Sequence, residues 1–259
     1  MRPVLALHCG LASGAAWAPL ARALPGVELT CPDLPGHGTA PDWDPARDFQ
    51  DQALDLALAA APDGAFDVVG HSFGGTLALR LAVAHPNRVR SLALVEPVMF
   101  AAAAPAARAA HAAEMAPFAA ALDRGDRDGA AAFFHGLWGA GAWDDLPDRV
   151  RGYITVRIHL IRACEPAILA DVHGVLDRLP GQVPVLIVTR RSPPDIVAAI
   201  VAGLRERMPQ AEVARIGDGH MVPMEAPAAL AARLGDFWGS PSRANRAASY
   251  RTSAHGGGG

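Results

Sequence analysis

The chain has 259 residues, of which 51% are hydrophobic and 19% charged, so it can bury the core of one large domain and is neither disordered nor fibrous. Its formal net charge of −3 gives no electrostatic reason to expect a nucleic acid or an anionic membrane as partner. The three cysteines have no disulfide spacing, the apolar run Val4–Leu7 is too short for a signal peptide, and no stretch approaches the ~20 apolar residues of a membrane span. We expect a cytoplasmic protein.

Short apolar runs alternate with amphipathic segments along most of the chain, which is the pattern of βαβ units in a parallel sheet. Strands are predicted at Val4–Leu7, Val27–Thr30, Phe66–Val69, Val89–Val95, Val183–Val188 and Glu212–Ile216. Helices are predicted at Ala15–Leu24, Phe49–Ala61, Thr76–His85, Asp195–Met208 and Pro227–Phe237. Right-handed crossovers place helices on both faces, so we expect a mostly parallel, doubly wound α/β sheet of about six strands.

The alternation stops between residues 100 and 179, where the chain is rich in alanine and is broken by glycine and proline. We expect a helical insertion at 100–179, with the α/β core formed by residues 1–99 and 180–239. Residues 240–259 end in four glycines and show no apolar periodicity, so a disordered tail is predicted there.

One turn between a predicted strand and a predicted helix has the pattern of a catalytic serine. The sequence Gly70-His71-Ser72-Phe73-Gly74 matches G-x-S-x-G, with an apolar strand before it and a helix after it. In that context the serine sits on a sharp, strained turn with its hydroxyl above the sheet, and the small glycines permit the turn. A glycine-rich βα turn with an incidental serine is the alternative interpretation.

Four motifs, in this order along the chain, resemble those of the α/β-hydrolase superfamily. They are the loop at His8, the turn Asp33-Leu34-Pro35-Gly36-His37-Gly38, the turn at Ser72 and the segment Gly219-His220-Met221. The resemblance covers residues 3–238 and implies an α/β-hydrolase fold that lacks the two N-terminal strands, with the family's cap at 100–179. It also implies that Ser72 is the nucleophile and His220 its base, which a serine hydroxyl needs at neutral pH.

The acidic member of the triad has two candidates. The resemblance puts an Asp in the loop after Val183–Val188, but Ser192 stands at that place, and Asp195 three residues later suits the N-cap of the next helix. Glu96 ends the strand after the nucleophile helix, where some family members, including a branch of the haloalkane dehalogenases, carry their acid. We favour Glu96, with Asp195 as the alternative acid. A carboxylate that anchors a loop, paired with an arginine of the insertion, is the structural interpretation of Glu96.

The resemblance also indicates the groups that surround the nucleophile. The backbone N–H groups of Gly10 and Phe73 are expected to form the oxyanion hole. Candidates for the substrate pocket are His71, Phe134, Trp138 and Trp143. Aromatic residues at helical spacing are also common core residues, which is the alternative for the three in the insertion.

These residues predict a serine hydrolase that cleaves a small, largely apolar, ester-like substrate through an acyl-enzyme. The same frame supports C–C bond hydrolysis and cofactor-free haloperoxidase or lyase chemistry, and a receptor-like protein with little turnover is an alternative of another class. The sequence has no metal, nucleotide or flavin motif, so we expect a small-molecule substrate and no cofactor. It does not determine the substrate or the oligomeric state.

Overall fold

The computed structural model describes residues 1–239, and the predicted tail at 240–259 lies outside the described residues. Its centre is a six-stranded, all-parallel sheet in the order β2-β1-β3-β4-β5-β6. The strands are β1 (Arg2–Leu7), β2 (Val27–Thr30), β3 (Phe66–His71), β4 (Val89–Val95), β5 (Val185–Thr189) and β6 (Glu212–Arg215). The predicted doubly wound α/β fold is confirmed, and each strand lies within two residues of its expected ends.

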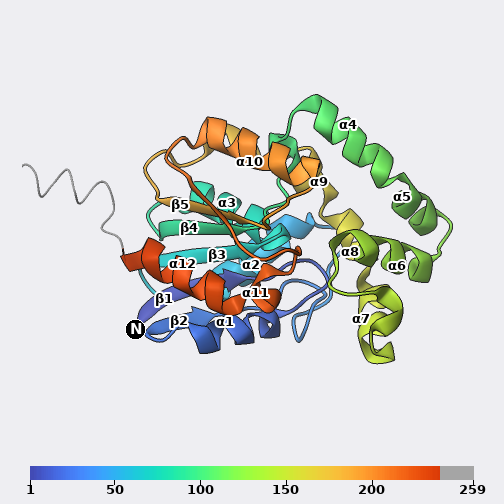
Figure 1. Ribbon diagram of the computed structural model, residues 1–259, viewed down its shortest axis with the longest axis horizontal. Helices are drawn as coiled ribbons and strands as arrows, with labels where there is room; N and C mark the ends of the chain where they lie inside the picture. The colour runs from blue at the N-terminus through green and yellow to red at the C-terminus, as the bar shows by residue number, and fades with distance from the viewer. Residues whose placement is uncertain (240–259) are drawn as a thin grey trace, which may run out of the picture.

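Alternate side chains of the central strands enter two separate cores. Along β4, Leu92 and Leu94 lie in one core, whereas Ala93 and Val95 lie in the other. The first core is covered by α2 (Phe49–Ala60), α3 (Phe73–Ala84) and α10 (Asp195–Arg207), and the second by α1 (Ala18–Ala23) and α12 (Pro227–Gly239) (Figure 1). Strands buried on both faces require continuous apolar runs, which is why the sequence revealed them.

Helix α3 begins at Phe73, three residues before its predicted start, and this difference has a steric cause. Gly74 and Gly75 suggest a loop, yet both lie in the first turn of the helix. A Cβ on Gly74 would lie 2.1 Å from the carbonyl oxygen of Leu7, and one on Gly70 would lie 2.2 Å from that of Gly74. The glycines therefore allow the helix to start close against the strands rather than delay its start.

The segment predicted as a helical insertion forms a group of short helices. They are α4 (Pro105–Glu114), α5 (Ala116–Asp123), α6 (Arg127–Trp138), α7 (Asp148–Arg157), α8 (His159–Ala163) and α9 (Glu165–Leu169). Helices α4 to α8 lie together beyond one end of the sheet (Figure 1). They have a small core of their own, centred on Phe118, Ala121 and Ile158. Within residues 1–239, no helix combines the length and apolarity needed to cross a membrane.

Candidate active site

Ser72 is the one-residue junction between β3 and α3. Its backbone has φ 55° and ψ −119°, a conformation that residues with a side chain adopt only at a cost in free energy. The junction is held by the Ser72 N–H, which donates to the carbonyl of Val95 at 2.9 Å, and by the close crossing of Gly70 and Gly74. Ser72 thereby lines a cavity between the α/β core and the helical insertion.

His220 and Glu96 meet behind that cavity although 124 residues separate them in the chain. Glu96 directly follows β4, His220 lies between β6 and α11 (Val222–Glu225), and both side chains are buried. His220 Nδ1 lies 3.1 Å from Glu96 Oε2. Because an ionised carboxylate can only accept, Nδ1 carries the proton, and Nε2 of the neutral imidazole is left as an acceptor.

His220 also lines the cavity that Ser72 lines, so the acceptor and the hydroxyl share one space. Within residues 1–239 no hydrogen bond joins the two side chains. Catalytic contacts of this kind are commonly long before substrate binds and shorten in the complex. The arrangement therefore has the parts of a nucleophile and its base, in the order Ser, acid, His along the chain.

The surroundings of Glu96 keep its carboxylate charged. Its side chain is 0% exposed, and its backbone has φ 47°, another costly conformation. Burial acts to raise the pKa of Glu96, but hydrogen bonds from His220 and Arg190 outweigh burial and hold that pKa below its ordinary value. Glu96 is therefore ionised at neutral pH, as an acid that stabilises a protonated imidazole must be.

Asp195, the alternative acid, lies elsewhere. It is exposed on the first turn of α10, and no hydrogen bond joins it to His220 within the described residues. Its predicted role as N-cap is wrong, because Pro194 holds that position and no side chain caps this helix. The carboxylate of Asp195 instead faces solvent where the helix dipole favours negative charge.

Arg190 is the residue of this site that the sequence did not reveal. It follows β5, in the loop where the resemblance places an Asp, and its guanidinium pairs with Glu96 at 2.7 Å. An arginine of the insertion was the expected partner of Glu96 in the structural interpretation, whereas Arg190 belongs to the α/β core. Among many arginines, no local pattern marks the one whose partner is 94 residues away.

Gly10 and Phe73, whose backbone N–H groups are the candidates for an oxyanion hole, both line the cavity. Phe73 is the first residue of α3, so its N–H has no partner inside the helix. The Gly10 N–H makes no hydrogen bond to any of residues 1–239, whereas the next N–H, of Leu11, donates to His37 Nε2 at 3.0 Å. Within residues 1–239, these two N–H groups therefore have no hydrogen-bond acceptor, as donors of an oxyanion hole require.

His8 and His37 hold the loops Cys9–Leu11 and Leu34–Pro35 in place through hydrogen bonds to the backbone. The Nε2 atom of each accepts from a backbone N–H at 3.0 Å, His8 from Leu34 and His37 from Leu11. Each Nδ1 therefore donates, to Cys9 O and Pro35 O respectively. Burial lowers the pKa of His8 to about 4 and that of His37 to about 3. Both imidazoles are neutral near pH 7, and each joins two backbone segments through its two ring nitrogens.

The cavity has a volume of about 660 Å³ and a largely apolar wall. Core and insertion both contribute to this wall, with side chains that include Val98, Phe100, Phe134, Trp138, Ile161 and Cys164. Phe134 and Trp138, two of the candidates for the substrate pocket, line this cavity and also pack against a hydrophobic core. Cavities of this size and character accommodate small, predominantly apolar ligands.

Two of the predicted pocket residues do not line the cavity. His71 is buried at the end of β3, where its Nε2–H donates to the backbone carbonyl of His220 at 2.9 Å and its ring packs 5.0 Å from the His220 ring. Trp143 packs against His135 at 5.5 Å and joins the small core of the insertion. His71 points into the protein because side chains alternate along a strand. Trp143 has the core role that aromatic residues at helical spacing often have.

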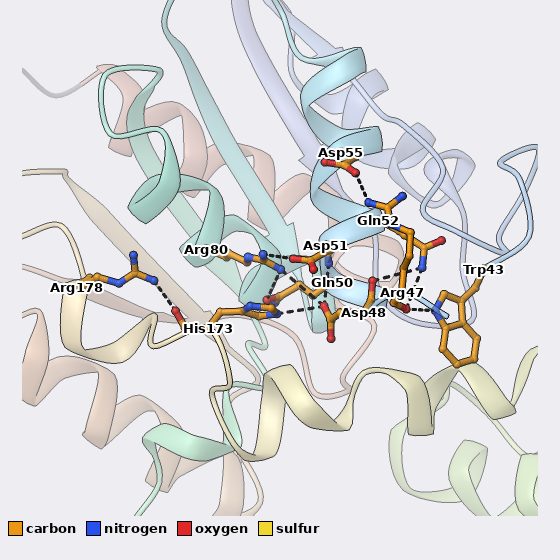
Figure 2. A network of polar contacts seen from close by, with 10 residues as sticks. All are labelled: Trp43, Arg47, Asp48, Gln50, Asp51, Gln52, Asp55, Arg80, His173 and Arg178. Atoms are coloured by element: carbon orange, nitrogen blue, oxygen red, sulfur yellow. Dashed lines mark hydrogen bonds and ion pairs between the residues drawn. The ribbon is translucent and has the colours of Figure 1, made fainter. Parts of the chain in front are cut away.

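A second polar cluster ties α2 to α3 (Figure 2). Within the described residues, Asp48, Asp51 and His173 are the group whose donor atoms lie close enough together to hold a metal ion. Arg80 pairs with both carboxylates, lying 3.8 Å from Asp48 Oδ1, and His173 Nε2 lies 3.1 Å from the same oxygen. Since Asp48 also caps α2 by accepting from the Asp51 N–H at 2.9 Å, the cluster is already a closed structural network.

The comparisons with known proteins agree with this architecture. The family described as "alpha/beta hydrolase fold" matches residues 2–154. Lipase LipV of Mycobacterium tuberculosis is 41% identical over 97 residues, 37% of each chain. A pimeloyl-[acyl-carrier protein] methyl ester esterase of Neisseria meningitidis serogroup C is 50% identical over 62 residues, 24% of this chain and 23% of the esterase. The chain thus matches well under half the length of these curated relatives.

Solved structures resemble the chain over nearly its whole length. An alpha/beta hydrolase from Sphaerobacter thermophilus superposes with a TM-score of 0.61 at 24% identity and covers 92% of each chain. A thermophilic esterase superposes with a TM-score of 0.67 at 19% identity, over 92% of this chain and 89% of the other. At these identities the likeness concerns the fold alone.

Proposed function

Because the chain belongs to the alpha/beta hydrolase fold family, we propose that it is a serine hydrolase that cleaves carboxylic esters with an apolar acyl group. The observation that carries this proposal is the hydrogen bond between His220 Nδ1 and Glu96 Oε2, which leaves His220 Nε2 as a base in the cavity that Ser72 lines. Relatives named as a lipase and an ester esterase support the same reaction class.

The chemistry follows from these positions. Ser72 Oγ attacks the ester carbonyl while His220 Nε2 takes the hydroxyl proton, and Glu96 stabilises the resulting imidazolium. The N–H groups of Gly10 and Phe73 bind the oxyanion of the tetrahedral intermediate. When the intermediate collapses, His220 returns the proton to the departing alkoxide. Water, deprotonated in turn by His220, then attacks the acyl-enzyme and releases the acid, so Ser72 recovers its hydroxyl.

The cavity indicates which part of the substrate is recognised. Its apolar wall would take the acyl chain, and burial of each methylene contributes about 0.8 kcal/mol to binding until the chain outgrows the space. A volume of about 660 Å³ suits a small or medium acyl group rather than a triglyceride. We therefore expect kcat/KM to rise with acyl length and then to fall.

A narrower candidate is the ester of an acyl group attached to an acidic carrier. Arg108 of α4 and Arg149 of α7 line the cavity, are exposed, and make no ion pair with any of residues 1–239. Unpaired guanidinium groups at the entrance favour a substrate whose distal part is anionic. The name of the Neisseria relative, which specifies an acyl-carrier protein, points in the same direction.

Hydrolysis of a p-nitrophenyl ester series and labelling by a fluorophosphonate test the proposal. Wild type should release p-nitrophenol and be labelled, whereas Ser72→Ala should lose both, with kcat down by at least about 10⁴-fold. Ser13→Ala is the matched control, since Ser13 lines the same cavity outside the nucleophile turn. A folded wild type that binds esters without turnover would refute the hydrolase and favour a receptor. Preference for carrier-bound over free methyl esters, lost at high salt, would select the narrower candidate.

A further inference from the structure

Arg190 occupies the strand end at which the resemblance places the catalytic acid. The carboxylate stands after β4, as Glu96, and a guanidinium stands after β5. Arg190 is only 8% exposed, which is unusual for arginine. A buried guanidinium requires an anionic or hydrogen-bonding partner. Its partner is the same carboxylate that orients His220.

Arg190 makes three hydrogen bonds to Glu96. The backbone N–H of Arg190 donates to Oε1 at 2.6 Å, and the side-chain Nε and Nη2 donate to Oε2 at 2.9 Å and 2.7 Å. Oε2 is also the oxygen that faces His220 Nδ1 at 3.1 Å. Contacts on both oxygens, from groups fixed to β5, leave the carboxylate no freedom to rotate away from the imidazole.

We propose that Arg190 is a positioning residue that aims Glu96 Oε2 at His220 Nδ1 and so holds the base in the tautomer the reaction needs. The role rests on the proposed function of the site and adds to it a residue that touches neither substrate nor the reacting atoms. The backbone contact sets the height of the carboxylate above the sheet, and the guanidinium sets its plane. A planar, permanently charged group performs this task better than an ammonium.

A residue of the helical insertion packs on Arg190 and His220. Trp138 of α6 places its ring 6.0 Å from the Arg190 guanidinium carbon and 5.0 Å from the His220 ring, in an edge-on arrangement. The first distance is within the range of a cation–π contact. The indole therefore covers both groups, and Arg190, Glu96 and His220 are all buried. Hydrogen bonds between buried groups are stronger than they would be in solvent.

The proposal has a consequence for the pH dependence of turnover. The ionisable side chains that contact Glu96 and His220 include Arg190, which directly follows β5, and His71 of β3. His71 is neutral because burial holds its pKa well below the ordinary value. Without the guanidinium, burial of Glu96 is opposed by fewer hydrogen bonds, so the pKa of Glu96 should rise. Protonated Glu96 cannot stabilise an imidazolium, so the acid-side loss of kcat/KM should move to higher pH.

Three variants test the role through kinetics. Arg190→Met should lower kcat about 10²-fold, as small misplacements of catalytic groups do, with KM changed less than about 3-fold and the acid limb of kcat/KM at higher pH. Arg190→Lys keeps the charge and the backbone contact and should recover part of kcat. Arg191→Met is the matched control: its guanidinium is exposed and pairs with Asp218, so kcat should stay at the wild-type value.

A double mutant separates positioning from a general structural role and also avoids a buried unpaired charge. If Arg190 acts through Glu96, Arg190→Met should cost little further kcat in a Glu96→Gln background. A further 10²-fold loss of kcat in the Glu96→Gln background would overturn the proposal. So would a folded Arg190→Met variant that keeps the wild-type kcat and an unchanged acid limb of kcat/KM.

The proton on His220 Nδ1 gives a readout that does not depend on turnover. In proton NMR it should appear as a low-field signal that is absent in Glu96→Gln, weakened in Arg190→Met and retained in Arg191→Met. If these signals behave as expected while wild type hydrolyses no ester, the proposed function fails and the positioning role stands. An unchanged signal in Arg190→Met overturns the positioning role, whether or not the enzyme turns over.

Discussion

The α/β core and the helical insertion contribute to one cavity by different means. Ser72, Glu96 and His220 are placed by strand ends or by the loop after a strand, and each lies against a sheet whose central residues are fully buried. The insertion consists of helices of 5 to 12 residues around a small core, and it contributes mainly apolar wall. Reacting groups need fixed geometry, whereas a wall need only match the shape of what it covers.

The two regions meet where Trp138 packs on His220 and over Arg190. This contact makes the comparison testable, because through Trp138 the insertion touches two residues of the proposed catalytic site. Changes in the core should reduce kcat for every substrate. Changes in the insertion should alter the order of preference among substrates.

Glu96→Gln should have the largest effect after loss of the nucleophile. An amide in place of the carboxylate cannot stabilise the imidazolium and can hold the wrong tautomer, so kcat should fall about 10³- to 10⁴-fold with little change in KM. Steady-state kinetics on a p-nitrophenyl ester measures this loss, and circular dichroism verifies the fold.

Asp67→Asn is a matched control for Glu96. Asp67 is also 0% exposed and pairs with Arg2 and Arg90, but it lies at the opposite end of β3 from Ser72. Burial opposes ionisation of Asp67, yet its hydrogen bonds hold its pKa below the ordinary value, so its contribution to stability is present above the unfolded pKa and is lost as pH falls through the folded one. The variant should melt at a lower temperature with unchanged kcat. A comparable loss of kcat in both variants would remove the distinction between the two ends of the sheet.

Trp138→Ala should have a smaller effect that depends on the substrate. Removing the indole enlarges the cavity beside His220, so the optimum acyl length should shift upward, and kcat/KM for short esters should fall about 10-fold. Trp143→Ala is the control, because Trp143 packs on His135 and does not line the cavity. Equal losses for all acyl lengths in Trp138→Ala would make the indole part of the catalytic geometry rather than of the wall.

The same division between regions decides what the sequence could predict. Continuous apolar runs identify buried parallel strands, and the turn at Ser72 is recognisable because its glycines and its context are local. The insertion has no such local pattern: Trp138 and Trp143 have the same side chain, and only tertiary packing places one at the cavity and the other away from it. Arg190 could not be identified from the sequence, since its role depends on a carboxylate that the neighbouring strand brings to it.

Asp195→Asn should have the smallest effect, and it completes the comparison of the two candidate acids. Asp195 is exposed on the first turn of α10, so the change removes one favourable charge–dipole interaction, worth about 0.5 kcal/mol at most positions of this kind. We expect a melting temperature lower by about 1 to 2 °C and an unchanged kcat and pH profile. Thermal unfolding and kinetics on the same preparation measure both. A loss of kcat above 10²-fold in Asp195→Asn, with near-normal turnover in Glu96→Gln, would mean that α10 moves toward His220 when substrate binds and that the acid is Asp195 after all.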